Sequence, residues 1–243
     1  MNPVSVLSFT QVKNNDLIAR LAINDALPQA KPGQYVNCAL EKNAKFFLPA
    51  YVFVVNRAAA YIEIYIRQAQ TKKMGLGLGL SVGSDDSPDV LFVSEPSGEF
   101  FVLPENEIKP LLIADETGLP SIIYLAEQIK QGCKIQPLVL LFSGSIYPFT
   151  PIPSQFVVSD FPAAVLAACP MLEDKKIPSR LICENFLPGC YEGSLSDFLA
   201  ELPDAFFSAA TMEVFAMGEK NMLENVRQFS LRRGLNFQVL LSL

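Results

Sequence analysis

The residues of this chain best suited to chemistry form one short turn, Ala114-Asp115-Glu116-Thr117-Gly118-Leu119-Pro120. The apolar run Pro110–Ala114 precedes the turn, and a helical pattern over Ser121–Ile129 follows it. A buried parallel strand that ends in a Thr-Gly turn and opens a helix directs free backbone N–H groups and the positive end of the helix dipole at one point. That point suits the pyrophosphate of a dinucleotide. A purely structural strand-turn-helix unit is the alternative.

A second segment, Glu213-Val214-Phe215-Ala216-Met217-Gly218-Glu219, also ends an apolar strand and precedes a helical pattern. Because the carboxyl ends of parallel strands meet at one edge of a sheet, Gly218 is expected to line the same crevice as the first turn. Thr117 can offer a hydroxyl there, and Gly118 permits a close backbone approach.

Two acidic residues in the first turn, Asp115 and Glu116, bring negative charge toward a bound pyrophosphate. They would repel it unless both side chains point away. The predicted nucleotide-binding residues are Ala114, Asp115, Glu116, Thr117, Gly118, Pro120, Met217, Gly218 and Glu219.

The composition excludes several kinds of chemistry. The chain has no histidine, which excludes Ser–His and Cys–His nucleophile pairs, histidine-bound metals and a histidine acid or base. Its five cysteines form no CxxC pair and are odd in number, so neither a disulfide framework nor a zinc site is expected. We therefore predict no catalytic side chain and no metal site, and expect a redox cofactor to supply the chemistry.

Charge and hydropathy limit the partners and the location. The formal net charge of −6 disfavours nucleic acid as a partner. No stretch approaches the roughly 18 consecutive apolar residues of a membrane span, and the start of the chain lacks the pattern of a secretory signal. Together with the unpaired cysteines, these features predict a cytoplasmic protein.

The first hundred residues carry the alternating pattern of strands, for example over Tyr51–Val55, Tyr61–Ile66 and Val90–Val93. Their spacing predicts a small antiparallel barrel. After Pro104 the pattern changes to apolar strands that alternate with helices, which predicts a parallel sheet with crossover helices. The boundary is expected near Leu103–Glu107, giving a barrel over residues 1–104 and an α/β domain over residues 105–243.

The expected elements of the second domain are strands at Leu111–Ala114, Leu138–Phe142, Arg180–Cys183, Glu213–Met217 and Phe237–Leu241, and helices from about Thr117 to Gln131, from Ser194 and from Glu219. Gly132 is expected to cap the end of the first helix, and Ser194 with Asp197 to cap the start of the second. Residues 144–179 contain many prolines and predict irregular connections.

This order of domains resembles the ferredoxin–NADP reductase superfamily. The likeness is carried by Lys31-Pro32-Gly33-Gln34-Tyr35-Val36 in the barrel and by Glu95-Pro96-Ser97-Gly98-Glu99-Phe100 before the second domain. Within the superfamily the segments Glu213–Leu223 and Phe237–Leu243 are most similar to the electron-transfer subunit of dihydroorotate dehydrogenase. The Asp-Glu-Thr turn is closer to the siderophore-interacting flavoreductases. The resemblance implies a flavin-type β-barrel that holds FAD and an NAD(P)-binding α/β domain, with hydride passing from NAD(P)H to FAD.

The sequence departs from the family at the flavin site. The family's Arg-x-Tyr-Ser motif corresponds to Pro49-Ala50-Tyr51-Val52, so the resemblance assigns Tyr51 to FAD but leaves no arginine for its phosphate. The family's second phosphate segment would fall at Thr71–Met74, where Lys72 and Lys73 could supply charge. The dihydroorotate subunit continues into a cysteine-rich segment that binds an iron–sulfur cluster, and no such cluster is expected here.

Three functional readings follow. The first is a flavin-dependent NAD(P)H oxidoreductase, or an electron-transfer subunit that serves a protein redox partner; the absence of Arg or Lys in Ser143–Tyr147 favours NADH over NADPH. The second is a degenerate, flavin-free binding or regulatory subunit, suggested by the altered flavin motif. The third is a ferric-siderophore reductase, against which the lack of a basic cluster argues.

Overall fold

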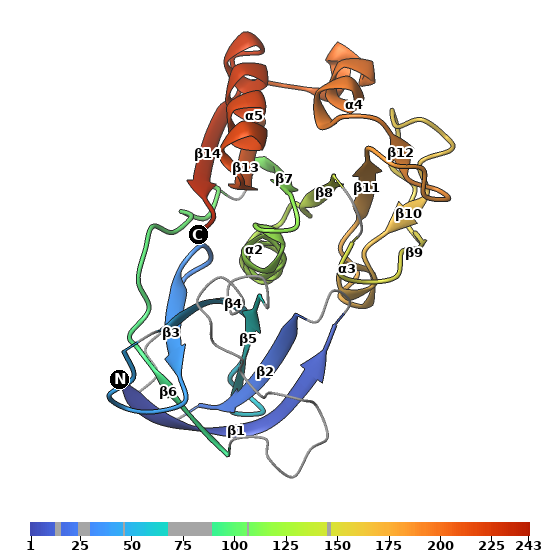
Figure 1. Cartoon of the computed structure of the whole chain (residues 1–243). Coiled ribbons are helices and arrows are strands. Elements are labelled where there is room, and N and C mark those ends of the chain that lie inside the picture. The colour runs from blue at the N-terminus through green and yellow to red at the C-terminus, as the bar shows by residue number, and fades with distance from the viewer. Residues whose placement is uncertain (13–15, 24–29, 46, 68–88, 106, 145–146) are drawn as a thin grey trace. The chain divides into compact units, whose positions relative to one another are not determined.

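The computed structural model describes residues 1–12, 16–23, 30–45, 47–67, 89–105, 107–144 and 147–243 (Figure 1). The predicted phosphate segment at residues 71–74, and Ser145 and Ile146 of the predicted coenzyme loop, lie outside these residues. The chain divides into two compact units, Met1–Phe100 and Phe101–Leu243.

The first unit is a closed barrel of six strands among its described residues. The strands are β1 (Asn2–Gln11), β2 (Leu17–Ala22), β3 (Tyr35–Ala39), β4 (Leu48–Asn56), β5 (Tyr61–Ile66) and β6 (Val90–Val93). They follow the order β1-β2-β5-β4-β3-β6, each pair is antiparallel, and β6 returns to pair with β1. The predicted antiparallel barrel is confirmed.

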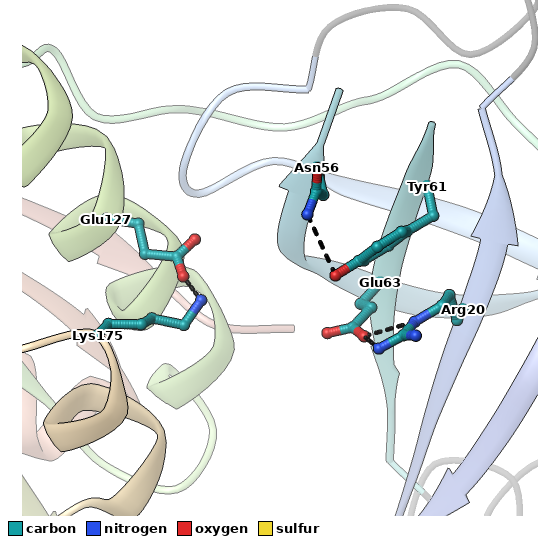
Figure 2. A network of polar contacts seen from close by, with 6 residues as sticks. All are labelled: Arg20, Asn56, Tyr61, Glu63, Glu127 and Lys175. Carbon is teal, nitrogen blue, oxygen red and sulfur yellow. Dashed lines mark hydrogen bonds and ion pairs between the residues drawn. The ribbon is translucent and has the colours of Figure 1, made fainter. Parts of the chain in front are cut away.

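Alternation along the strands separates the inside of the barrel from its outside. In β2, Leu17, Ala19 and Leu21 are buried, whereas Arg20 between them is half-buried. Arg20 lies opposite Glu63 of β5, and its Nη2 is 2.6 Å from the Glu63 carboxylate (Figure 2). Its guanidinium also lies 4.3 Å from the centre of the Tyr61 ring. These contacts tie β2 to β5 on the outer face.

The second unit contains a parallel sheet of six strands among its described residues. The strands are β7 (Lys109–Ala114), β8 (Leu138–Ser143), β11 (Ser179–Cys183), β12 (Tyr191–Glu192), β13 (Met212–Gly218) and β14 (Asn236–Leu241). The spatial order is β12-β11-β8-β7-β13-β14, and every neighbouring pair is parallel. The predicted strands of the α/β domain are confirmed within a residue or two.

Helices cover both faces of this sheet. Leu111 and Ile113 of β7 belong to the same buried cluster as residues of α4 (Leu195–Glu201) and α5 (Lys220–Arg232). Leu112, which lies between them, points to the opposite face, as alternate residues of a strand do. There α2 (Leu119–Gly132) packs against β7, β8 and β13 (Figure 1). Burial on both faces explains the nearly continuous apolar strands.

The helix ends show which local predictions are correct. Ser194 and Asp197 form a reciprocal capping box at the start of α4, as predicted. Gly132 is the last residue of α2, and Cys133 in an extended conformation is the cap, so the predicted glycine cap is wrong. The helix therefore ends without the left-handed residue that a glycine cap supplies.

A partly buried ion pair joins α2 to Lys175, the residue after α3 (Pro170–Asp174). The Lys175 side chain is 30% exposed, and its ammonium contacts the carboxylate of Glu127, whose side chain is 10% exposed (Figure 2). The surrounding proline-rich region forms short connections with one two-stranded ladder, β9 (Ile152–Pro153) with β10 (Ala167–Ala168). Across the described residues, no helix has both the length and the apolarity needed to span a membrane.

Candidate functional site

The predicted turn lies where the strand order of the second unit reverses. The first strand of this sheet, β7, has β8 and then β11 on one side and β13 on the other, with Ala114 opposite Met217. In open α/β sheets, ligands bind outside the carboxyl ends of the strands at such a switch point. The two segments singled out in the sequence, Asp115–Pro120 after β7 and Gly218–Glu219 at the end of β13, meet there.

Asp115 organises the turn after β7. Its Oδ1 accepts hydrogen bonds from the backbone N–H of Thr117 (2.8 Å), from that of Gly118 (3.1 Å) and from the Thr117 hydroxyl (2.6 Å). The backbone N–H of Leu119 donates to the Asp115 carbonyl at 3.0 Å. Asp115 is 5% exposed, so its charge is stabilised by these donors rather than by water.

The same carboxylate reaches the second segment. Asp115 Oδ2 accepts a 2.6 Å hydrogen bond from the backbone N–H of Glu219, the residue that precedes α5. The two acidic side chains would repel a pyrophosphate unless both pointed away, and Asp115 points into the backbone amides. Glu116 turns to the end of β8, where the Ser143 hydroxyl donates to it at 2.5 Å.

The two glycines of the site have no spare room. A Cβ at Gly118 would lie 1.8 Å from the carbonyl oxygen of Met217. A Cβ at Gly218 would lie 2.3 Å from Met222 Cε and 2.5 Å from Asp115 Oδ2. Both glycines therefore allow the chain's own two loops to pack together, and the close backbone approach expected at Gly118 is to Met217.

Ser242, which follows a neighbouring strand, completes the edge. Its role could not be foreseen from the turn motif. The Thr117 and Ser242 hydroxyls are 2.5 Å apart. Since Thr117 donates its proton to Asp115, Ser242 donates to Thr117. The Ser242 backbone N–H also donates to the Gly218 carbonyl at 3.0 Å. Its position directly after β14 is the signal that could have identified it, because that strand adjoins β13.

All nine predicted nucleotide-binding residues lie at this edge. Ala114 and Met217 are fully buried, Thr117 is 5% exposed, and Glu219 is exposed. Of the nine, Glu219 is exposed and Glu116 is partly exposed, whereas the other seven are buried. The backbone amides and the Thr117 hydroxyl at this edge are therefore engaged within the protein, and the chain offers no histidine as a base.

Tyrosine and cysteine groups beside the edge are poor acids. Tyr147 is buried, its hydroxyl lies 2.7 Å from the Leu141 carbonyl and 2.6 Å from that of Ile182, and burial raises its pKa well above the usual value. Cys183 and Cys190 interact through their side chains, and burial raises the pKa of Cys190 to about 12. Both thiols stay protonated at neutral pH and are weak nucleophiles.

The barrel holds the residue assigned to flavin. Tyr51 of β4 lies opposite Tyr35 of β3, and the two rings pack edge to face with centres 6.3 Å apart. Tyr51 is 3% exposed, so its ring is covered by the barrel's own residues. Neighbouring Pro49 and Val52 have no side-chain donor or charge for a flavin phosphate, and the second phosphate segment falls outside the described residues.

A hollow of about 730 Å³ in the second unit lies away from this edge, between α4 and the carboxyl end of α5. Arg233 is one of the residues that line this hollow. Its guanidinium is paired with Asp204 and lies 4.4 Å from the centre of the Phe207 ring. Glu219 marks the opposite end of α5.

Within the part of the chain that the structure describes, no cluster of three or more Cys, Asp or Glu could hold a metal ion.

Comparison with known proteins identifies the fold. No protein-family model and no curated protein matches the chain. A solved ferredoxin NADP+ reductase from Neisseria gonorrhoeae with bound FAD and NADP is 10% identical, has a TM-score of 0.69, and is matched over 100% of this chain and 98% of that one. The ferredoxin reductase in carbazole 1,9a-dioxygenase is 16% identical, with a TM-score of 0.71, over 98% of this chain and 68% of that one.

The chain is also similar to part of a much longer protein, an intact type IV self-sufficient cytochrome P450 monooxygenase. The two are 13% identical with a TM-score of 0.65, and the match covers 98% of this chain but 28% of that one. The likeness to these solved structures confirms the expected fold, an antiparallel barrel followed by an α/β unit with a parallel sheet. The narrower likenesses, to the dihydroorotate dehydrogenase subunit and to siderophore flavoreductases, stay predictions.

Proposed function

We propose that this chain is a flavin-dependent NAD(P)H oxidoreductase, or the electron-transfer unit of one, that passes hydride from nicotinamide to FAD and electrons onward. The observation that carries the proposal is the meeting of Asp115–Pro120 and Gly218–Glu219 at the switch point of the parallel sheet. Dinucleotides bind at this place in sheets of this kind. The closed antiparallel barrel supports the flavin half of the proposal.

The cofactors supply the redox chemistry, and the protein positions them. In this proposal the edge formed by Ala114–Pro120 and Met217–Glu219 binds the dinucleotide, and Tyr51 contacts the flavin ring. Gly118 and Gly218 keep the two loops in contact. The hydrogen bond between the Thr117 and Ser242 hydroxyls holds both groups in place. No side-chain acid or base is assigned, because hydride transfer between the two rings requires none.

The loop after β8 favours NADH over NADPH in this proposal. A Cβ at Gly144 would lie 3.8 Å from the Glu184 carboxylate, and that carboxylate is exposed. A 2′-phosphate would meet a negative charge here, where NADP-binding proteins place a cation. The described residues of the predicted coenzyme segment, Ser143, Gly144 and Tyr147, include no Arg or Lys.

We place the protein in the cytoplasm with a protein as its electron acceptor. The five cysteines are free of disulfides in the structure, which suits a reducing compartment. The neighbour that is a ferredoxin reductase in a dioxygenase supports the idea of a protein acceptor.

The absorbance spectrum of the purified protein tests the proposal. We expect visible flavin bands, either as purified or after addition of FAD and removal of the excess, and we expect anaerobic NADH to bleach them. A colourless protein that takes up no FAD would contradict the proposal and would indicate the flavin-free binding subunit instead. Denaturation should release FAD if the yellow colour comes from a non-covalent cofactor.

A further inference from the structure

The Asp115 carboxylate occupies the point at which the crevice's backbone amides converge. Three N–H groups, those of Thr117, Gly118 and Glu219, donate to its two oxygens. Each N–H group makes one well-directed hydrogen bond, so these three donors are not free for a phosphate oxygen while Asp115 holds them. The protein therefore already contains an anion at the place where the fold would hold the ligand's anion.

This arrangement is more than a turn cap. An aspartate that caps its own turn accepts from the N–H groups two and three residues later, which accounts for the bonds from Thr117 and Gly118. It does not account for the 2.6 Å bond from Glu219, which belongs to the loop after a different strand. A Cβ at Gly218 would lie 2.5 Å from Asp115 Oδ2, so the carboxylate packs directly against the backbone of the second loop.

We propose that Asp115 is a built-in anion that competes with the pyrophosphate of a dinucleotide for the amides of Thr117, Gly118 and Glu219. A pyrophosphate gains these donors only if the carboxylate leaves them, and it must also overcome the repulsion between the two anions. Asp115 thereby sets the affinity of the crevice for pyrophosphate-bearing ligands. The proposal rests on the proposed function only in naming the dinucleotide as the ligand.

The test measures binding of inorganic pyrophosphate, and separately of NADH, to the full chain by titration calorimetry at low ionic strength. In the Asp115→Ala variant the amides lose their internal partner, and we expect both ligands to bind about tenfold tighter or more, a change of about 1.4 kcal/mol. We expect a lower melting temperature for the same variant, because the buried donors lose their acceptor.

Asp197→Ala is the matched control. Asp197 also accepts a backbone N–H at a helix start of the same unit, through the capping box with Ser194, but it lies in α4. We expect this variant to lose stability while its affinity for pyrophosphate and NADH stays that of the wild type. A rise in affinity in both variants would point to general loosening of the unit and would overturn the proposal.

The remaining outcomes are also decisive. If Asp115→Ala is folded, as judged by circular dichroism, and binds pyrophosphate no more tightly than the wild type, Asp115 is a structural cap and the proposal is wrong. If Asp115→Ala does not fold, Asp115→Asn carries the test, since it removes the charge while keeping the shape, and its affinity must rise. Pyrophosphate binding needs no flavin, so tighter binding by a colourless protein would support this inference while the proposed function fails.

Discussion

The carboxylate of Asp115 and the backbone N–H of Glu219 are 2.6 Å apart, and this hydrogen bond joins the loops after β7 and β13. The two strands are neighbours at the point where the strand order reverses. The Asp115 side chain thus holds together the two loops at the edge where the fold would bind a ligand. The consequence is that the local stability of this edge and its affinity for anions depend on the same residue.

The contact between Gly118 and Met217 predicts a severe effect of a single methyl group. In Gly118→Ala the new Cβ would lie 1.8 Å from the Met217 carbonyl oxygen, so one of the two loops must move. We expect a loss of several kcal/mol in the free energy of unfolding, measured by urea denaturation. Gly132→Ala is the control, since nothing lies within 4 Å of its Cβ. In the last turn of α2 it should stabilise the protein by up to about 1 kcal/mol. Equal stability of the two variants would contradict the packing described.

Coenzyme preference should respond to Glu184. Its carboxylate lies near Gly144 and would repel a 2′-phosphate. For the flavin-loaded protein we expect a higher kcat/KM with NADH than with NADPH. Glu184→Gln should lower the ratio of kcat/KM with NADH to kcat/KM with NADPH several-fold, because it raises kcat/KM with NADPH. Glu192 is an exposed carboxylate of β12, and Glu192→Gln should leave this ratio unchanged. An unaltered ratio in Glu184→Gln would show that the 2′-phosphate binds elsewhere.

The Glu127–Lys175 pair predicts a coupled effect on stability. Removing Lys175 leaves a carboxylate whose side chain is 10% exposed without its ammonium partner (Figure 2). We expect Lys175→Met to lower the free energy of unfolding by about 2 kcal/mol. Adding Glu127→Gln should restore part of the loss, since no unpaired charge then stays buried. If the double variant is as unstable as the sum of the single variants, the two side chains are not coupled.

Buried thiols predict a loss of stability at alkaline pH. Burial raises the pKa of Cys38 and of Cys169 to about 12 from an ordinary 9.0. Because the folded pKa values exceed the unfolded ones, the thiols favour the folded state fully below about pH 9, and this contribution is lost as the pH rises toward 12. Urea unfolding across this range should show a falling free energy of unfolding, and Cys169→Ala should make the fall shallower. A flat profile would contradict burial of these thiols.

The sequence contained the elements of the fold because their signals are local. Each signal depends on residues only a few positions apart in the chain. Examples are the alternation in Tyr61–Ile66, the apolar run before Asp115 and the Ser194–Asp197 cap. The prediction for Gly132 failed because a glycine near a helix end is also compatible with the last helical position. Composition alone could not decide between the two.

The direction of the Asp115 side chain could not be read from the sequence. The turn motif left open whether this carboxylate points away from a pyrophosphate site. Its inward orientation depends on a donor at Glu219, which only the packing of β13 beside β7 brings within reach. The same holds for Ser242, which joins the site because β14 pairs with β13. Contacts between loops of different strands are set by tertiary structure, and the turn motif by itself does not encode them.

We propose that this protein transfers hydride from a nicotinamide to a flavin, and anaerobic stopped-flow reduction of the FAD-loaded protein observes that step itself. We predict that NADH bleaches the flavin band in a single turnover. NADH carrying deuterium at the transferred position should do so more slowly, because the bond to that hydrogen is broken in the step. A bound flavin that stays oxidised in excess NADH and in excess NADPH would rule out hydride transfer by this protein.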